Sequence, residues 1–134
     1  MELRATGATL PEAFARIALG LFAAAVDPAT VAEDDVREVR AHGGGVPALL
    51  RAFLQECLYV HEVEGFACRA IDFVVFDAAS GAGGETVRLH ALLKGESIDP
   101  ARHRVSPVRN VLSAELIPEP ASPGPYEVRA TLEP

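Results

Sequence analysis

The stretch LLRAFLQECLYVHEVEGFACRAIDFVVF, residues 49–76, changes its hydrophobic periodicity part of the way along. Its first half repeats apolar residues at spacings of three and four, which predicts the buried face of a helix. Its second half, residues 66–76, is rich in β-branched and aromatic residues, which favours a strand. We therefore predict a helix over residues 47–61, followed by a turn that Gly65 closes.

A second helix is predicted upstream, over residues 10–26. Thr9 and Glu12 form a capping box and Pro11 occupies the first turn, and such a box is worth about 1 kcal/mol. Apolar residues follow at helical spacing until Asp27 ends the pattern. The residues predicted to pack the two helices against a sheet are Phe14, Ile17, Leu21, Leu50, Phe53 and Leu54.

The remaining segments predict strands. Residues 86–92 alternate in polarity and are predicted to form an antiparallel hairpin with residues 66–76, joined by a loop at Gly81–Gly84. Residues 95–103 are predicted to form an irregular crossover. The segment 118–125 contains four prolines, which predicts an exposed turn. Further strands are predicted at residues 2–7, 36–41, 108–117 and 126–132.

Together these elements predict one domain of the α+β class over residues 1–134. Two helices among five or six strands indicate a sandwich in which both helices pack on one face of a mostly antiparallel β-sheet. The length agrees with this prediction, because 134 residues is too short for two comfortable hydrophobic cores.

The composition limits the possible functions. The chain has 12 Lys and Arg against 19 Asp and Glu, a formal net charge of −7. Such an acidic chain is repelled by phosphate backbones, so we expect no tight binding of nucleic acid. The sequence shows neither an apolar run long enough to cross a membrane nor a secretory leader, so we expect a cytoplasmic protein. Cys57 and Cys68 lack metal-site and redox spacing and are expected to be reduced packing residues.

Conventional catalytic patterns are missing from the sequence. It has no GxSxG, no GxxxxGK[ST], and no GxGxxG that opens a helix. His61, Glu62 and Glu64 could hold a metal ion, but we favour the alternative of a solvated helix end, because zinc needs three well-placed ligands. The acidic run 33–35 is predicted to be a solvated turn.

Three polar residues on the predicted crossover form a second candidate cluster. Asp99 and His103 stand four residues apart, close to Glu96. They could form a ligand set or the site of a small hydrolase, although neither a nucleophile nor an oxyanion-binding device accompanies them in the sequence. The alternative that we favour is a hydrogen-bonded loop.

Read in order, several segments resemble the archease family. Residues 5–14, ATGATLPEAF, resemble the family's strand, glycine and capped helix, and residues 49–59, LLRAFLQECLY, resemble its second helix. Residues 95–103 resemble its crossover. Residues 107–111, PVRNV, fall where archeases have a Val-Lys-Ala-Val-Thr strand, and residues 126–133 resemble the closing strand. The resemblance extends over nearly the whole chain.

This resemblance implies an archease-like fold and an accessory role without catalysis. Archeases activate the RNA ligase that joins 2′,3′-cyclic-phosphate or 3′-phosphate ends to 5′-hydroxyl ends, notably in tRNA splicing. They promote guanylylation of the ligase and its multiple turnover, and they hold a divalent ion. The implied partner is an RNA ligase protein, whose basic, metal-loaded cleft an acidic protein could approach. The alternative is a diverged binding or chaperone-like module without a ligase partner.

The resemblance also implies which residues act on the partner. Arg109 stands in the position of the family's strand lysine, which keeps the charge but changes the donor geometry. Glu96, Asp99 and His103 are the other residues that the resemblance assigns to partner activation.

The metal site implied by the resemblance is incomplete in this sequence. Glu133 replaces the family's terminal aspartate ligand, and Pro134 stands where a backbone carbonyl is offered. The other aspartate ligand would fall immediately before Met1. We therefore expect either a native chain that extends upstream or weak binding of the divalent ion, which is expected to be calcium.

Overall fold

A computed structural model describes residues 1–78, 86–117 and 125–133 of the chain. These residues contain two α-helices and six strands. One sheet has the strand order β1-β6-β5 and the other β2-β4-β3, and every neighbouring pair is antiparallel. The α+β class predicted from the sequence is confirmed. In chain order the elements are β1 (Glu2–Gly7), α1 (Leu10–Ala25), the short 3-10 helix η1 (Pro28–Thr30), β2 (Asp35–Gly43), α2 (Val46–Glu62), β3 (Phe66–Asp77), β4 (Val87–Ser97), β5 (Asn110–Ile117) and β6 (Tyr126–Glu133).

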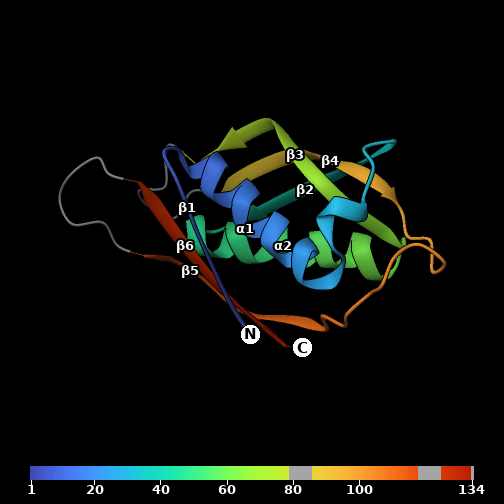
Figure 1. Ribbon diagram of the computed structural model, residues 1–134. Helices are drawn as coiled ribbons and strands as arrows, with labels where there is room; N and C mark the ends of the chain where they lie inside the picture. The colour runs from blue at the N-terminus through green and yellow to red at the C-terminus, as the bar shows by residue number, and fades with distance from the viewer. Residues whose placement is uncertain (79–85, 118–124, 134) are drawn as a thin grey trace.

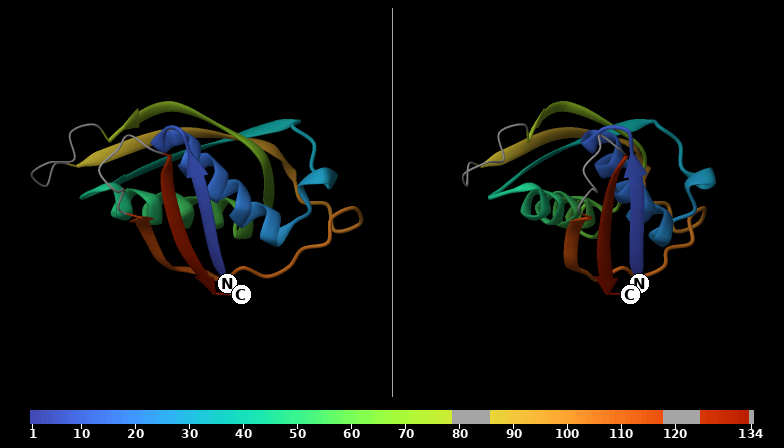
Figure 2. Two further views of the ribbon diagram at one scale, coloured as in Figure 1. Left: turned by 60° about the vertical axis from the view of Figure 1, so that its left-hand side comes forward. Right: turned by 90° about the vertical axis from the view of Figure 1, so that its left-hand side faces the viewer.

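The helices form a layer between the two sheets (Figures 1 and 2). Helix α1 packs against β1 and β6 of one sheet and β3 of the other, while α2 packs against β5 on one side and β2 on the other. The sequence predicted helices on one face of a single sheet; the structure has a sheet on either side of them. The physical reason is the width of the apolar stripe on α1, where adjacent pairs such as Ala13–Phe14 and Leu21–Phe22 are buried together.

The local signals that begin and end the helices are confirmed in part: among the described residues the Thr9 half of the predicted capping box is present, whereas the Glu12 carboxylate pairs with Arg16 at 2.5 Å. The Thr9 side-chain hydroxyl accepts a hydrogen bond from the backbone N–H of Glu12 at 3.3 Å, and Pro11 lies in the first turn of α1. Gly65 follows α2 with φ +63°, a left-handed conformation that favours glycine. Both helix positions predicted from the sequence are therefore confirmed to within one residue at each end.

The core contains all six predicted packing residues, and none of them is more than 1% exposed. Phe14 on α1 contacts Phe76 of β3 edge-on, with ring centroids 5.0 Å apart, and is stacked with Phe53 of α2 at 6.2 Å. Phe53 in turn meets Phe73 of β3 at 5.6 Å. These four rings, the phenylalanine cluster, connect both helices to the same strand.

Cys57 and Cys68 are buried and free, as the sequence predicted. Burial raises the pKa of the Cys68 thiol to about 12, so this side chain stays protonated at neutral pH. No helix among the described residues has both the length and the apolar character needed to cross a membrane.

Several predicted strand boundaries were wrong. Gly95–Ser97, predicted to begin the crossover, continue β4, because Gly95 pairs with both Asp35 and Cys68. A Cβ atom at Gly95 would lie 1.8 Å from the carbonyl oxygen of Ala67, so only glycine allows β3 to approach this closely. Strand β5 begins at Asn110 rather than at residue 108, and the crossover therefore covers residues 98–109.

Other predicted segments differ in smaller ways. The strand predicted at residues 36–41 extends over Asp35–Gly43, so the acidic run 33–35 is exposed as expected but its last residue already belongs to β2. The predicted hairpin is confirmed by the antiparallel pairing of β3 with β4. Its predicted loop at Gly81–Gly84 lies outside the described residues, as does the predicted turn at 118–125 except for its last residue.

Replacing Phe14 tests the phenylalanine cluster. Phe14→Ala should lower the free energy of unfolding by about 3–5 kcal/mol, because it removes a buried ring and leaves a cavity between the two helices and β3. Urea unfolding followed by circular dichroism measures the loss. Tyr59, which is 54% exposed on α2, provides the control, and Tyr59→Ala should change stability by no more than about 0.5 kcal/mol. Equal stability of the Phe14 variant and the original protein would contradict the packing described here.

Candidate functional site

The predicted site residues form two groups, one near each end of the crossover 98–109. Glu96, Asp99 and His103 surround its beginning, where the chain leaves β4. Arg109 and Glu133 meet at its end, where the chain enters β5. In Figure 1 the crossover runs from the end of β4 down to the sheet that contains both termini. Among the described residues, no hydrogen bond or ion pair joins the two groups directly.

Glu96 is the centre of the first group. Its Oε2 atom accepts a hydrogen bond from the backbone N–H of Ala32 at 2.5 Å, and its Oε1 atom accepts one from Nη2 of Arg102, also at 2.5 Å. Glu96 is only 9% exposed. The Ala32 N–H and the Arg102 guanidinium hold the pKa of this carboxyl below its ordinary value. The ionised carboxylate therefore connects the crossover to the segment that follows η1.

His103 has a fully buried side chain with both ring nitrogens engaged. Its Nδ1 accepts a hydrogen bond from the backbone N–H of Asp99 at 2.9 Å, which leaves the proton on Nε2. Nε2 lies 3.1 Å from the carbonyl oxygen of Thr30 and 3.5 Å from Oε2 of Glu96. The Asp99 carboxylate accepts a hydrogen bond from the N–H of Ala101 at 2.9 Å. The interpretation as a hydrogen-bonded loop is confirmed.

This geometry gives the cluster a structural role in the crossover. A general base must reach the proton that it removes, whereas His103 is enclosed and hydrogen-bonded on both sides. Asp99 is the exposed member, but its carboxylate caps the turn that follows it. Whether Glu96, Asp99 and His103 contribute to partner activation stays a prediction, and these contacts would make them positioning residues.

Sequence reasoning missed Arg102 and the segment 30–32. Together with Glu96, Asp99 and His103 they form what we call the Glu96 cluster. Arg102 follows Glu96 by six residues, a spacing that belongs to no regular element. Only the fold of the crossover brings the two side chains together. The contacts of Glu96 and His103 with residues 30–32 join positions more than sixty residues apart and have no local signal in the sequence.

The helix end at His61 is not solvated, so that prediction was wrong for the histidine. His61 is 5% exposed, and its Nδ1 donates a hydrogen bond to the carbonyl oxygen of Phe66 at 3.1 Å. The His61 ring is buried because β3 begins shortly after α2 ends, so that Phe66 at the start of β3 lies beside the ring. Glu62 is exposed, and the exposed Glu64 accepts a hydrogen bond from Nε of Arg37 at 3.2 Å. The three side chains therefore do not form a ligand set.

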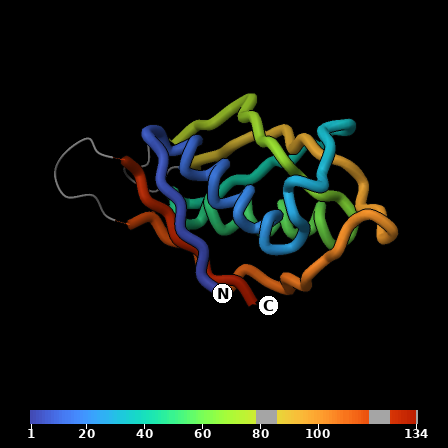
Figure 3. Tube along the Cα trace, in the orientation of Figure 1, coloured from blue at the N-terminus to red at the C-terminus, as the bar shows by residue number. Residues whose placement is uncertain are grey.

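The second group lies at the end of the β1-β6-β5 sheet where the termini meet. Arg109 was predicted to lie on a strand, but it is exposed and immediately precedes β5, and its N–H donates to the carbonyl oxygen of Glu133 at 2.8 Å. The Met1 ammonium donates to the carbonyl oxygen of Leu132 at 3.0 Å. Figure 3 shows the first residue beside the end of β6. Backbone hydrogen bonds thus bring Arg109 and Met1 to the end of β6, beside Glu133.

The described residues at this end do not by themselves fit a calcium site. Calcium takes six to eight oxygen ligands. Of the ligands that the resemblance implies, the described residues at this end supply one carboxylate, that of Glu133. Pro134, the other implied ligand, lies outside the described residues. Across residues 1–78, 86–117 and 125–133, no group of three or more His, Cys, Asp and Glu side chains could hold a metal ion.

The amino-acid sequence of this chain is similar to those of one family of known proteins. The sequence model of the archease protein family matches residues 1–111. The protein archease of Pyrococcus abyssi is 34% identical over 101 residues, which are 75% of this chain and 68% of that protein. The protein archease of Thermococcus gammatolerans is 36% identical over the same shares. This chain belongs to the archease family.

A solved structure shares the fold. The solution structure of protein 1598 from Methanobacterium thermoautotrophicum superposes with a TM-score of 0.76 at 24% identity, and the match covers 98% of this chain and 90% of that one. The family match ends at residue 111, so Arg109 lies inside it and Glu133 lies beyond it.

The Glu96 cluster predicts a pH-dependent loss of stability. The folded-state pKa of Glu96 is lowered, so its carboxylate contributes stability above the ordinary value of 4.5 and loses that contribution as the pH falls through the lowered value. Glu96→Gln should therefore destabilise the protein near neutral pH, and the difference from the original protein should shrink below pH 4.5.

Urea unfolding at a series of pH values measures this difference. Glu62→Gln, at an exposed glutamate of α2, is the matched control and should show no comparable difference. A destabilisation by Glu96→Gln that is the same at acidic and neutral pH would show that the ionised carboxylate is not what holds the crossover.

Proposed function

We propose that this protein is an accessory activator of the RNA ligase that joins 3′-phosphate or 2′,3′-cyclic-phosphate ends to 5′-hydroxyl ends. In this role it promotes guanylylation of the ligase and its multiple turnover in tRNA splicing or RNA repair. The observation that carries the proposal is that this chain belongs to the archease family. The matched residues 1–111 contain the segment that resembles the family's crossover and Arg109, which stands in the position of the strand lysine.

The negative net charge of the chain supports binding to a protein partner rather than direct binding to RNA. The chain carries a net charge of −7, which opposes tight association with a phosphate backbone and favours contact with a basic protein surface. We expect the proposed ligase to offer such a surface around its active site. In this proposal the accessory protein performs no catalysis of its own.

The proposed contact surface is the end of the β1-β6-β5 sheet that carries Arg109 and Glu133. Both residues are exposed, and their backbones are fixed to one another by the 2.8 Å hydrogen bond. Glu96, Asp99 and His103 are proposed to act at a distance, because they hold the beginning of the crossover whose last residue is Arg109. The side chain that meets the ligase is thus Arg109, and the Glu96 cluster positions it.

Replacing Arg109 tests the proposed contact. Arg109→Ala should lower ligase stimulation by about tenfold or more, because a hydrogen bond from a charged donor is worth about 1.5–3 kcal/mol. Arg109→Lys, which restores the residue of the family strand, should retain most of the stimulation. The measurement is multiple-turnover joining by a purified cognate ligase, with ligase guanylylation as the second readout.

The control variant is Arg51→Ala, which removes an exposed arginine from α2 and should leave stimulation unchanged. Full stimulation by a folded Arg109→Ala protein would remove Arg109 from the contact. Absence of stimulation by the unmodified protein would favour the alternative of an archease-fold binding module without a ligase partner.

Calcium binding by the 134-residue chain is proposed to be weak. Glu133 with the backbone carbonyl of Pro134 supplies few of the oxygens that calcium requires, so we expect a dissociation constant on the order of 10⁻⁴–10⁻³ M. Isothermal titration calorimetry measures it, and Glu133→Gln should weaken binding further. Glu127→Gln on the same strand is the control. A sub-micromolar affinity abolished by Glu133→Gln would show that this chain already contains a complete site.

A further inference from the structure

Four basic side chains lie together on the β2-β4-β3 sheet. Arg40 and His42 belong to β2, and Arg88 and His90 belong to β4. The register places Arg40 opposite His90 and His42 opposite Arg88. Directly opposed residues have Cβ atoms about 5 Å apart, and alternate residues of one strand are about 7 Å apart, so the four side chains leave the backbone from a small rectangle. We refer to them as the basic cluster.

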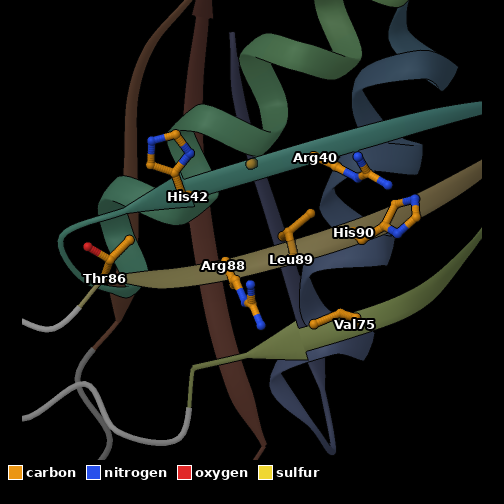
Figure 4. Close-up of a pocket in the computed structure, with 8 residues that line it drawn as sticks. Arg40, His42, Val75, Thr86, Arg88, Leu89 and His90 are labelled. Atoms are coloured by element: carbon orange, nitrogen blue, oxygen red, sulfur yellow. The ribbon is translucent and has the colours of Figure 1, made fainter.

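The basic cluster lines the cleft shown in Figure 4, which has a volume of about 590 Å³. Val75 of β3 and Thr86, just before β4, also line it. Arg40 and His90 lie next to each other across the two strands in this view, while His42 and Arg88 project nearer the strand ends. A cleft of this volume is within the range of small-molecule sites.

The basic cluster is incompletely neutralised by the protein. Arg37, Arg102 and Arg129 each contact a carboxylate. In the part of the chain that the structure describes, Arg40 and Arg88 do not form such a pair, although Asp77 lies opposite Arg88 in the register. Both side chains are exposed, so their guanidinium groups are accessible to a ligand in the cleft that they line.

His90 supplies an independent sign of a ligand. Its Nε2 atom is buried and has no partner of hydrogen-bond geometry within the described residues. Oε1 of Glu38 lies 3.3 Å from it, which is close enough for an ion pair with a protonated ring, but the direction is poor for a hydrogen bond. A buried polar atom left without a hydrogen bond is costly, and a ligand oxygen entering the cleft would satisfy it.

We propose that the cleft binds the phosphoryl group of a small molecule such as a nucleotide. Each guanidinium can donate two parallel N–H bonds to phosphate oxygens, and the imidazoles of His42 and His90 provide further donors. Val75 and Thr86 offer an apolar surface and a hydroxyl to the remainder of the ligand. This inference does not rest on the proposed action on a ligase.

The surroundings of the cleft favour a short ligand over a nucleic-acid strand. Glu38 lies on β2, and Asp72 and Asp77 lie on β3, so carboxylates border the basic cluster on both edge strands of the sheet. The next cation along β4, Lys94, is already paired with Asp72 at 2.5 Å. A long polyanion leaving the cleft would meet these carboxylates, whereas a single phosphorylated molecule fits within them.

Titration calorimetry on the full chain tests the proposal with three probes: inorganic phosphate, ATP and a short oligouridylate. We expect ATP to bind, and Arg40→Ala with Arg88→Ala to weaken its binding by about tenfold or more, because both phosphate contacts are charge-assisted. The matched control is Arg51→Ala with Arg104→Ala, which removes two exposed arginines from other surfaces and should leave ATP affinity within about twofold.

Thermal unfolding verifies that each double variant is folded, as the exposure of all four arginines leads us to expect. If the Arg40 and Arg88 pair proves unstable, Arg40→Gln alone carries the same test. Equal affinity for phosphate and ATP assigns the site to the phosphoryl group, and tighter ATP binding adds the nucleoside; both support the proposal. No binding of either small probe, an equal loss in the control, or tighter binding of the oligouridylate would overturn it.

Discussion

The phenylalanine cluster is the contact on which the arrangement of layers depends. A helix that packs on one sheet needs a single apolar stripe, whereas each helix here must satisfy a sheet on either side. Phe14 and Phe53 bring α1 and α2 together and face β3 through Phe73 and Phe76. Aromatic pairs of this kind add about 0.5–1.5 kcal/mol beyond the area that they bury. With this contact in place, the opposite sides of the helices are free to pack against β1, β5 and β6.

The crossover illustrates how polar contacts can hold a segment that has no regular structure. Its beginning is fixed by the Glu96 cluster, and its end by the hydrogen bond from Arg109 to Glu133. Between them, Val105 forms an isolated antiparallel bridge with Val26, and the N–H of Ser106 donates to the carbonyl oxygen of Ala25 at 2.8 Å. The crossover is therefore attached to both sheets and to the end of α1, which gives its exposed residues a defined position.

The sequence predicted best those features whose cause is local. The cap at Thr9, the glycine at position 65 and the spacing of Phe14 and Leu50 each act within a few residues, and the two helices follow from them. The hairpin of β3 and β4 was predicted because its two strands follow one another in the chain, but pairing between strands distant in the sequence could not be predicted. Periodicity does not reveal that β6 lies between β1 and β5, so two sheets were interpreted as one.

The same distinction applies to the candidate sites. The spacing of Asp99 and His103 was sufficient to predict a hydrogen-bonded loop, because both side chains belong to one turn of the chain. Arg40 and His90 gave no signal, since they become neighbours only through the register of β2 with β4. His61 was misjudged because its burial depends on the direction in which the chain leaves α2, which the helical pattern does not contain.

The position of β6 between β1 and β5 also sets an order for folding during synthesis. Glu2 pairs with Thr131 and Asn110 with Glu133, so neither outer strand has its neighbour until β6 has left the ribosome. Helix α1 and the β2-β4-β3 sheet are complete much earlier, at residue 97. The nascent chain must therefore hold one side of its helices uncovered while the rest is made. Pairings this distant in sequence are slow to form and leave apolar surface exposed meanwhile, so the arrival of β6 is the step that covers this side of the helices.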